Sequence, residues 1–178
     1  MIPVQIQSDD HKINEGDGQS VFYTVFTPET KPVLATVLVI HGMQEHSGRY
    51  EALALYFADQ GFAVLTYDHP GHGKSVPDAL AMGFFREVDP DGLLISVADE
   101  MKNILKERYP EVSHFVLGHS MGSFITRCLL QQSGSAFDGA VIVGTGGPLV
   151  GIGLIKRYFL MANRLNPHRR PGFNNLFS

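Results

Sequence analysis

The chain has 178 residues, of which 44% are hydrophobic and 18% charged. This composition is typical of one folded domain with a sizeable core, and it excludes a disordered chain. The formal net charge is −4, and residues 1–150 contain all 18 acidic residues but only 9 of the 14 Lys and Arg residues. Such an acidic body offers no broad basic surface, so we expect no nucleic-acid partner. The single cysteine, Cys128, excludes an intrachain disulfide.

The two ends of the chain differ in character. The opening MIPVQIQSDD lacks the basic and apolar runs of a signal peptide, and the apolar run at 33–40 is far too short to span a bilayer. We therefore expect a cytoplasmic protein. Residues 151–178 contain basic but no acidic residues. We predict that 1–150 forms the core of the fold and that 151–178 begins a separate segment.

The predicted elements follow one another in a regular order. Two short β-type runs at 4–7 and 21–27, separated by the turn-rich NEGDGQ, predict an N-terminal hairpin. Apolar runs then predict strands at 35–40, 62–67, 115–117 and 140–143. Helical spacing falls between them at 49–60, 91–108 and 121–132. This alternation predicts an α/β fold with a mostly parallel sheet and helices on both faces, and strand 140–143 should form an open apolar edge.

A serine lies at a strand-to-helix junction. Gly118-His119-Ser120-Met121-Gly122 has the spacing G-x-S-x-G and lies between a predicted strand and a predicted helix. So sharp a turn needs glycines, and it would expose Ser120 Oγ above the carboxyl end of the sheet. The unpaired amides at the helix start would face an oxyanion formed there. The alternative is a strand-end turn in which the serine has no chemical role.

A second motif, His41-Gly42-Met43, comes directly after strand 35–40. Gly42 allows the backbone to approach a ligand closely, and the Met43 N–H is placed to pair with the Met121 N–H in an oxyanion hole. His41 and His46 lack an obvious third ligand at this loop spacing, so we expect no metal and no other cofactor.

A third motif, YDHPGHGKS at 67–75, ends in a sequence that suggests a phosphate-binding loop. That loop would require glycine at position 68, where the chain has Asp68. We therefore predict a tight structural loop at the top of the sheet and not a nucleotide site.

Together, HGMQEHSGRY (41–50), YDHPGHGKS (67–75) and GHSMGS (118–123) resemble the α/β-hydrolase superfamily. The resemblance is strongest to its monoacylglycerol lipase and lysophospholipase-like branch, also called serine aminopeptidase-like. It implies cleavage of single-chain acyl esters of glycerol or glycerophospholipids through an acyl-enzyme. It also implies that Ser120 is the nucleophile, that the Met43 and Met121 amides form the oxyanion hole, and that the motifs are completed by His41, Gly42, Gly118, His119 and Gly122.

The partners of the serine are harder to find. In α/β-hydrolases the acid and then the histidine follow the nucleophile, but beyond Ser120 the chain has only Asp138 and His168. Asp138 precedes a predicted strand and should lie at the amino end of the sheet, opposite the serine. His168 lies in the basic, proline-rich NPHRRPGF.

The histidines near the motifs do not supply the base either. We expect His119 to point away from the serine, and the histidines that precede Ser120 to brace loops; these are His41, His69 and His72. We therefore expect this chain to be the N-terminal portion of a larger hydrolase, with residues 1–150 as the first part of its core and 151–178 as the start of its lid or cap. The acid, the histidine and the later strands would be supplied by further C-terminal polypeptide.

Two questions stay open at this point. Residues 153–166 form an amphipathic helix candidate, which could pack on its own domain, begin a lid over an acyl-chain pocket, or contact an anionic membrane surface. The alternatives to an esterase are a non-catalytic binding or scaffold protein that retains the fold, and a peptidase or thioesterase of the same fold.

Overall fold

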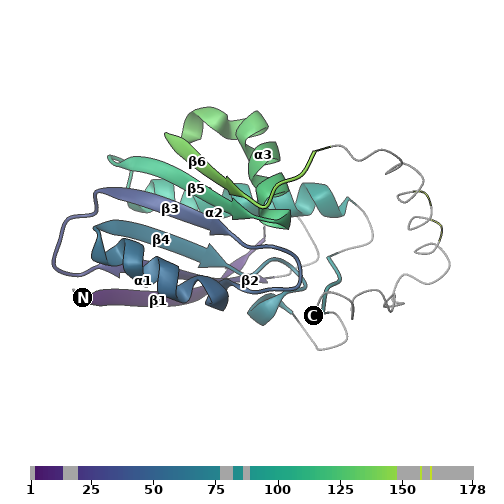
Figure 1. Cartoon of the computed structure of the whole chain (residues 1–178). Helices are drawn as coiled ribbons and strands as arrows, with labels where there is room; N and C mark the ends of the chain where they lie inside the picture. Colours follow the sequence, from purple (N-terminus) through teal and green to yellow (C-terminus); the bar gives the residue numbers. More distant parts are fainter. Residues whose placement is uncertain are drawn as a thin grey trace. The chain divides into compact units, whose positions relative to one another are not determined.

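A mixed sheet forms the centre of the unit Met1–Thr145 (Figure 1). The computed structural model describes residues 3–13, 20–76, 82–85 and 89–147, together with Arg157 and Met161. In these residues the strand order is β1-β2-β4-β3-β5-β6. The strands are β1 (Val4–Lys12), β2 (Ser20–Pro28), β3 (Ala35–Ile40), β4 (Phe62–Tyr67), β5 (Ser113–His119) and β6 (Gly139–Val143). Strands β4, β3, β5 and β6 are parallel, while β1 and β2 are antiparallel, so the predicted mostly parallel sheet is confirmed.

The predicted N-terminal hairpin is also confirmed, although β1 is longer than its apolar pattern indicated. It continues to Lys12, which pairs with Ser20 of β2. Because β1 is an edge strand and most of its side chains are exposed, polar residues can continue the strand without entering the core. The NEGDGQ turn lies outside the described residues.

The helices cover both faces of the sheet, as predicted. They are α1 (Glu51–Asp59), α2 (Pro90–Arg108) and α3 (Met121–Ser133), with short 3₁₀ turns η1 (Ser47–Tyr50), η2 (Gly73–Ser75) and η4 (Gly134–Ala136). Helix α1 packs against β4 and β2, whereas α2 and α3 pack against each other and against β3, β4 and β5. Helix α1 begins later than expected because Ser47–Tyr50 forms the 3₁₀ turn, and Gly61 ends it with a φ of +95°.

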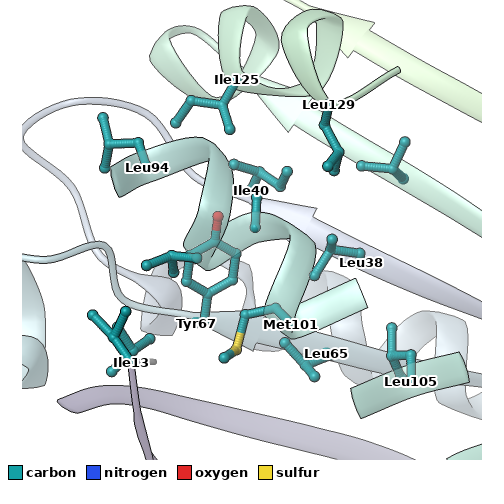
Figure 2. Packing of buried hydrophobic residues seen from close by; sticks show 14 of the residues in the cluster. Ile13, Leu38, Ile40, Leu65, Tyr67, Leu94, Met101, Leu105, Ile125 and Leu129 are labelled. Carbon is teal, nitrogen blue, oxygen red and sulfur yellow. The ribbon is translucent and has the colours of Figure 1, made fainter. Parts of the chain in front are cut away.

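Strand β3 lies between the two apolar layers, which explains its unbroken apolar sequence. Every residue of β3 is buried. Leu38 and Ile40 join the larger core under α2 and α3, whereas Val37 and Val39 join the smaller core under α1. Figure 2 shows the larger core, in which the side chains of β3 and β4 meet those of α2 and α3; these include Leu38, Ile40, Leu65, Tyr67, Met101, Leu105, Ile125 and Leu129.

Helix α2 follows the predicted spacing closely. Leu94, Val97, Met101 and Leu105 are buried, and Ile104 packs partly buried against the same core. The single cysteine, Cys128, lies on α3 and is half-buried, unlike the fully buried core residues of α2.

Strand β6 ends the sheet within the described residues, where it pairs only with β5. Its side chains Val141, Ile142 and Val143 are 53%, 39% and 44% exposed, so the predicted open apolar edge is present in the part of the chain described. None of the described helices is both long enough and apolar enough to cross a bilayer.

The chain divides into two units, Met1–Thr145 and Gly146–Ser178. The predicted boundary after residue 150 stays a prediction. The amphipathic segment 153–166, apart from Arg157 and Met161, and His168 lie outside the described residues.

Candidate active site

Ser120 occupies the turn between β5 and α3, at the carboxyl end of the parallel strands. Its backbone has φ 52° and ψ −116°, a conformation that costs a residue with a side chain about 1–3 kcal/mol. The Ser120 N–H donates to the Val143 carbonyl oxygen at 2.9 Å, and the Ser123 Oγ–H donates to the Ser120 carbonyl at 2.6 Å. The strain is therefore held in place from both the sheet and the helix.

The two flanking glycines allow this turn to exist. A Cβ on Gly118 would overlap Thr126 Oγ1 and the Gly122 carbonyl oxygen. A Cβ on Gly122 would overlap the Ile40 carbonyl oxygen of β3. Without these side chains the first turn of α3 lies directly against the strands, which brings its free N-terminal amides next to Ser120.

The loop after β3 lies against the same turn. A Cβ on Gly42 would be 3.0 Å from Ser120 Cβ and 3.3 Å from the His119 carbonyl oxygen. The structure therefore brings together the His41-Gly42-Met43 motif and the Ser120 motif at the carboxyl ends of β3 and β5, which are neighbours in the sheet.

The amides around Ser120 differ in whether they are already paired. In the loop, the Gly42 N–H donates to Glu45 and the Gln44 N–H donates to His72 Nε2 at 3.4 Å. In the helix, the Ser123 N–H donates to the Ser120 carbonyl at 2.9 Å. Among the described residues, the Met43 and Met121 amides have no hydrogen-bond acceptor. They are thus available to bind an anionic oxygen.

Three histidines brace the loops, as expected. His41 Nδ1–H donates to the Gly42 carbonyl at 2.7 Å, and its Nε2 accepts from the His69 N–H at 3.1 Å. His69 Nε2–H donates back to the His41 carbonyl at 2.9 Å, and His72 Nδ1–H donates to the Pro70 carbonyl at 3.1 Å. Because both nitrogens of His41 are used by backbone groups, the ring is held neutral and has no lone pair left for a serine proton.

Burial favours the neutral form of these rings. Desolvation lowers the pKa of His41 to about 4, although its hydrogen bond to Gly42 opposes the shift. Desolvation also lowers the pKa of His69 and of His72. His69 Nδ1 is buried without a hydrogen-bond partner, so a proton added there would have no acceptor.

Acidification should therefore destabilise the fold. The unfolded chain takes up protons below about pH 6.5, whereas folded His41 resists protonation down to about pH 4. The free energy of unfolding is therefore highest above pH 6.5 and decreases as the pH falls towards 4. The lowered pKa of His41 alone accounts for about 2 kcal/mol of this decrease at pH 5. Urea unfolding followed by circular dichroism at pH 7.5 and pH 5.0 measures it, and His41→Asn should flatten the dependence. Equal unfolding free energies at the two pH values would contradict the prediction.

The loop after β4 is structural, in agreement with the sequence. The buried Asp68 carboxylate accepts from the Ser47 N–H and the Lys74 N–H, each at 2.7 Å. The Ser75 hydroxyl donates to the Asp68 carbonyl at 2.8 Å and accepts from the Phe22 N–H of β2 at 2.9 Å. The Lys74 amide and the Ser75 hydroxyl, which a phosphate-binding loop would direct at a phosphate, therefore form hydrogen bonds within the protein.

Two of the candidate partners in the sequence contact other groups and not the serine hydroxyl. Asp138 accepts from the His114 N–H at 2.8 Å near the start of β5, at the end of that strand opposite Ser120. His119 lies 3.1 Å from Glu45 Oε1 through its Nδ1. No described residue forms a hydrogen bond with Ser120 Oγ. In the described part of the chain, no group of three or more His, Cys, Asp or Glu side chains is arranged to hold a metal ion.

One residue at the site was not singled out from the sequence. Glu45 lies inside the quoted HGMQEH motif, yet its carboxylate is buried at the junction of the loop and the Ser120 turn. A glutamate in a polar loop is usually exposed to solvent, so the sequence provides no strong reason to expect a buried carboxylate. The one available signal was that an acidic residue lies close to a glycine that forms a turn.

Comparison with known proteins agrees with this arrangement. The family model for serine aminopeptidase, S33, matches residues 31–171. Monoglyceride lipase of Mus musculus is 32% identical over 142 residues, which are 79% of this chain and 43% of that protein. Monoacylglycerol lipase of Mycolicibacterium smegmatis is 33% identical over 117 residues, which are 65% of this chain and 39% of that protein.

A solved structure extends the match to three dimensions. A thermostable carboxyl esterase from Bacillus coagulans has a TM-score of 0.78 and 30% sequence identity, covering 89% of this chain and 51% of that one. The chain thus spans about half the length, or less, of these relatives. The family match, the parallel sheet and the glycine-flanked serine turn agree with one another, and the chain belongs to the serine aminopeptidase S33 family of α/β-hydrolases.

Proposed function

We propose that this protein is a serine hydrolase that cleaves carboxylic esters, with Ser120 as the nucleophile. The observation that carries the proposal is the Ser120 turn, in which a strained serine lies beside two amides that have no acceptor among the described residues, those of Met43 and Met121. Such strain is retained where the surrounding structure enforces it, and it is concentrated at reactive sites.

In the proposed reaction, Ser120 Oγ attacks the ester carbonyl carbon and its proton passes to a general base. The Met43 and Met121 N–H groups then donate to the developing oxyanion, and each such donor contributes about 3–4 kcal/mol of transition-state stabilisation. Protonation of the leaving alcohol oxygen breaks the C–O bond, and water hydrolyses the acyl-enzyme.

We further propose that the histidine base and its carboxylate partner come from polypeptide beyond the described residues. The described histidines near Ser120 support this view, because His41, His69 and His72 brace loops and His119 contacts Glu45. The substrates we propose are single-chain acyl esters, with monoacylglycerols before lysophospholipids, because relatives named monoglyceride lipase from mouse and human cover most of this chain.

Reaction of the full-length protein with a fluorophosphonate tests the proposal. We expect one adduct per molecule, located by peptide mass spectrometry at Ser120, because only an activated serine attacks phosphorus at a useful rate. Ser123 provides an internal control three residues away, since its hydroxyl is fully buried and already donates to the Ser120 carbonyl. A folded protein without an adduct would instead favour the non-catalytic binding protein.

A further inference from the structure

We propose that Glu45 is a positioning residue for the oxyanion hole, an inference that rests on the function proposed above. Its carboxylate connects the loop that carries the Met43 amide with the turn that carries the Met121 amide. The side chain is 5% exposed although it belongs to a loop.

The Glu45 carboxylate is surrounded by donors from both segments. Oε1 accepts from the Gly42 N–H, from the Tyr50 hydroxyl at 2.8 Å and from His119 Nδ1–H at 3.1 Å. Oε2 forms an ion pair with Arg49 Nη1 at 3.0 Å. These contacts hold residues on either side of the hole, because Gly42 directly precedes Met43 and His119 directly precedes Ser120.

The backbone of the loop is shaped around this contact. Gln44 has a φ of 60°, which turns the chain so that the side chain of the next residue folds back onto the start of the same loop. With the Gly42 N–H held by Glu45 and the Gln44 N–H held by His72, the amide between them is fixed from both sides. That amide is the Met43 N–H.

The environment keeps Glu45 ionised. Burial raises the pKa of this carboxyl, but hydrogen bonds from Gly42, His119 and Tyr50 outweigh burial and lower the pKa below its usual value. The pKa of Tyr50 is raised, first by burial and then by its hydrogen bond to Glu45, so the phenol remains a donor. A carboxylate is needed because three donors converge on one of its oxygens.

The role of Glu45 is orientation and not direct charge stabilisation. A bare negative charge beside an oxyanion would raise the barrier, but here the hydrogen bonds from Gly42, Tyr50 and His119 offset it. Donors lower the barrier most when they are aligned before the oxyanion forms, so loosening the loop should cost catalysis more than substrate binding.

The test compares Glu45→Gln with Arg49→Gln in the full-length protein. Glutamine keeps the size of Glu45 and one acceptor oxygen, but it removes the charge that strengthens the three hydrogen bonds to Oε1. Arg49→Gln removes only a 65% exposed partner of the other oxygen. With a 4-nitrophenyl ester and active sites counted by fluorophosphonate titration, we expect kcat of Glu45→Gln to fall about 10- to 100-fold while KM changes less than about threefold. For Arg49→Gln we expect kcat within about threefold of wild type.

The outcomes separate this proposal from the proposed function. The positioning role is overturned if Glu45→Gln keeps the wild-type kcat per titrated site. It is equally overturned if the variant loses activity only because fewer of its molecules are titrated. Either result leaves the proposed role of Ser120 intact. If Glu45→Gln does not fold, Glu45→Asp provides the second variant: it keeps the charge but is one methylene too short, and a wild-type kcat there overturns the proposal equally. Failure of the proposed function itself would appear as wild-type turnover in Ser120→Ala.

Discussion

Replacement of Ser120 by alanine should lower kcat for ester hydrolysis by about 10⁴-fold or more in the full-length protein. Alanine removes the oxygen that, in the proposed reaction, forms the acyl-enzyme, while the Met43 and Met121 amides stay. The fold should survive, because Ser120 Oγ forms no hydrogen bond with any described residue. Steady-state kinetics with a monoacylglycerol and a 4-nitrophenyl ester measure the loss.

A second substitution at the same position reports on the strain of the turn. Because Ser120 has a φ of 52°, Ser120→Gly should be equally inactive but more stable than Ser120→Ala, by about 1 kcal/mol. Ser133→Ala is the activity control, since it removes a serine hydroxyl at the other end of α3, where that hydroxyl donates to Asp99. Turnover of Ser120→Ala within tenfold of wild type would end the proposal that Ser120 is the nucleophile.

Replacement of Gly122 by alanine should lower the free energy of unfolding by about 3 kcal/mol and abolish fluorophosphonate labelling. The added Cβ would overlap the Ile40 carbonyl oxygen, which belongs to the backbone of a fully buried strand and cannot rotate away. Helix α3 would have to move off β3, and the Met121 amide would move with it. Both the core and the proposed oxyanion hole depend on this close approach.

Gly134→Ala is the matched control for that experiment. Gly134 follows α3 in a right-handed helical conformation, with φ −60° and ψ −32°, and a Cβ there meets no atom within 4 Å. This variant should therefore unfold at or slightly above the wild-type denaturant concentration. Equal stability of Gly122→Ala and Gly134→Ala would show that α3 is not held against β3 as described.

The elements that were predicted well are those whose signal is local. The run ATVLVI predicted β3 with its correct ends because a strand buried on both faces has no polar residues to blur its bounds. The sharp turn at Ser120 was predicted because two glycines flank the serine, and without side chains they permit a close strand-to-helix turn that other residues would block. Strand β1 was predicted too short because pairing at a sheet edge, and not an apolar pattern, carries it to Lys12.

The amino-acid sequence by itself determined the order of strands and helices, the parallel sheet and the position of Ser120 at a strand end, because periodicity, β-branching and glycine act over a few neighbouring residues. Only the tertiary structure decided what the loops do to one another. The His69 N–H bonds His41 across 28 positions, and Glu45 meets His119 across 74, because parallel strands bring distant loops to one edge of the sheet. The spacing of residues along the chain does not predict such long-range contacts. The buried Glu45 carboxylate near Ser120 was therefore found only in the folded structure.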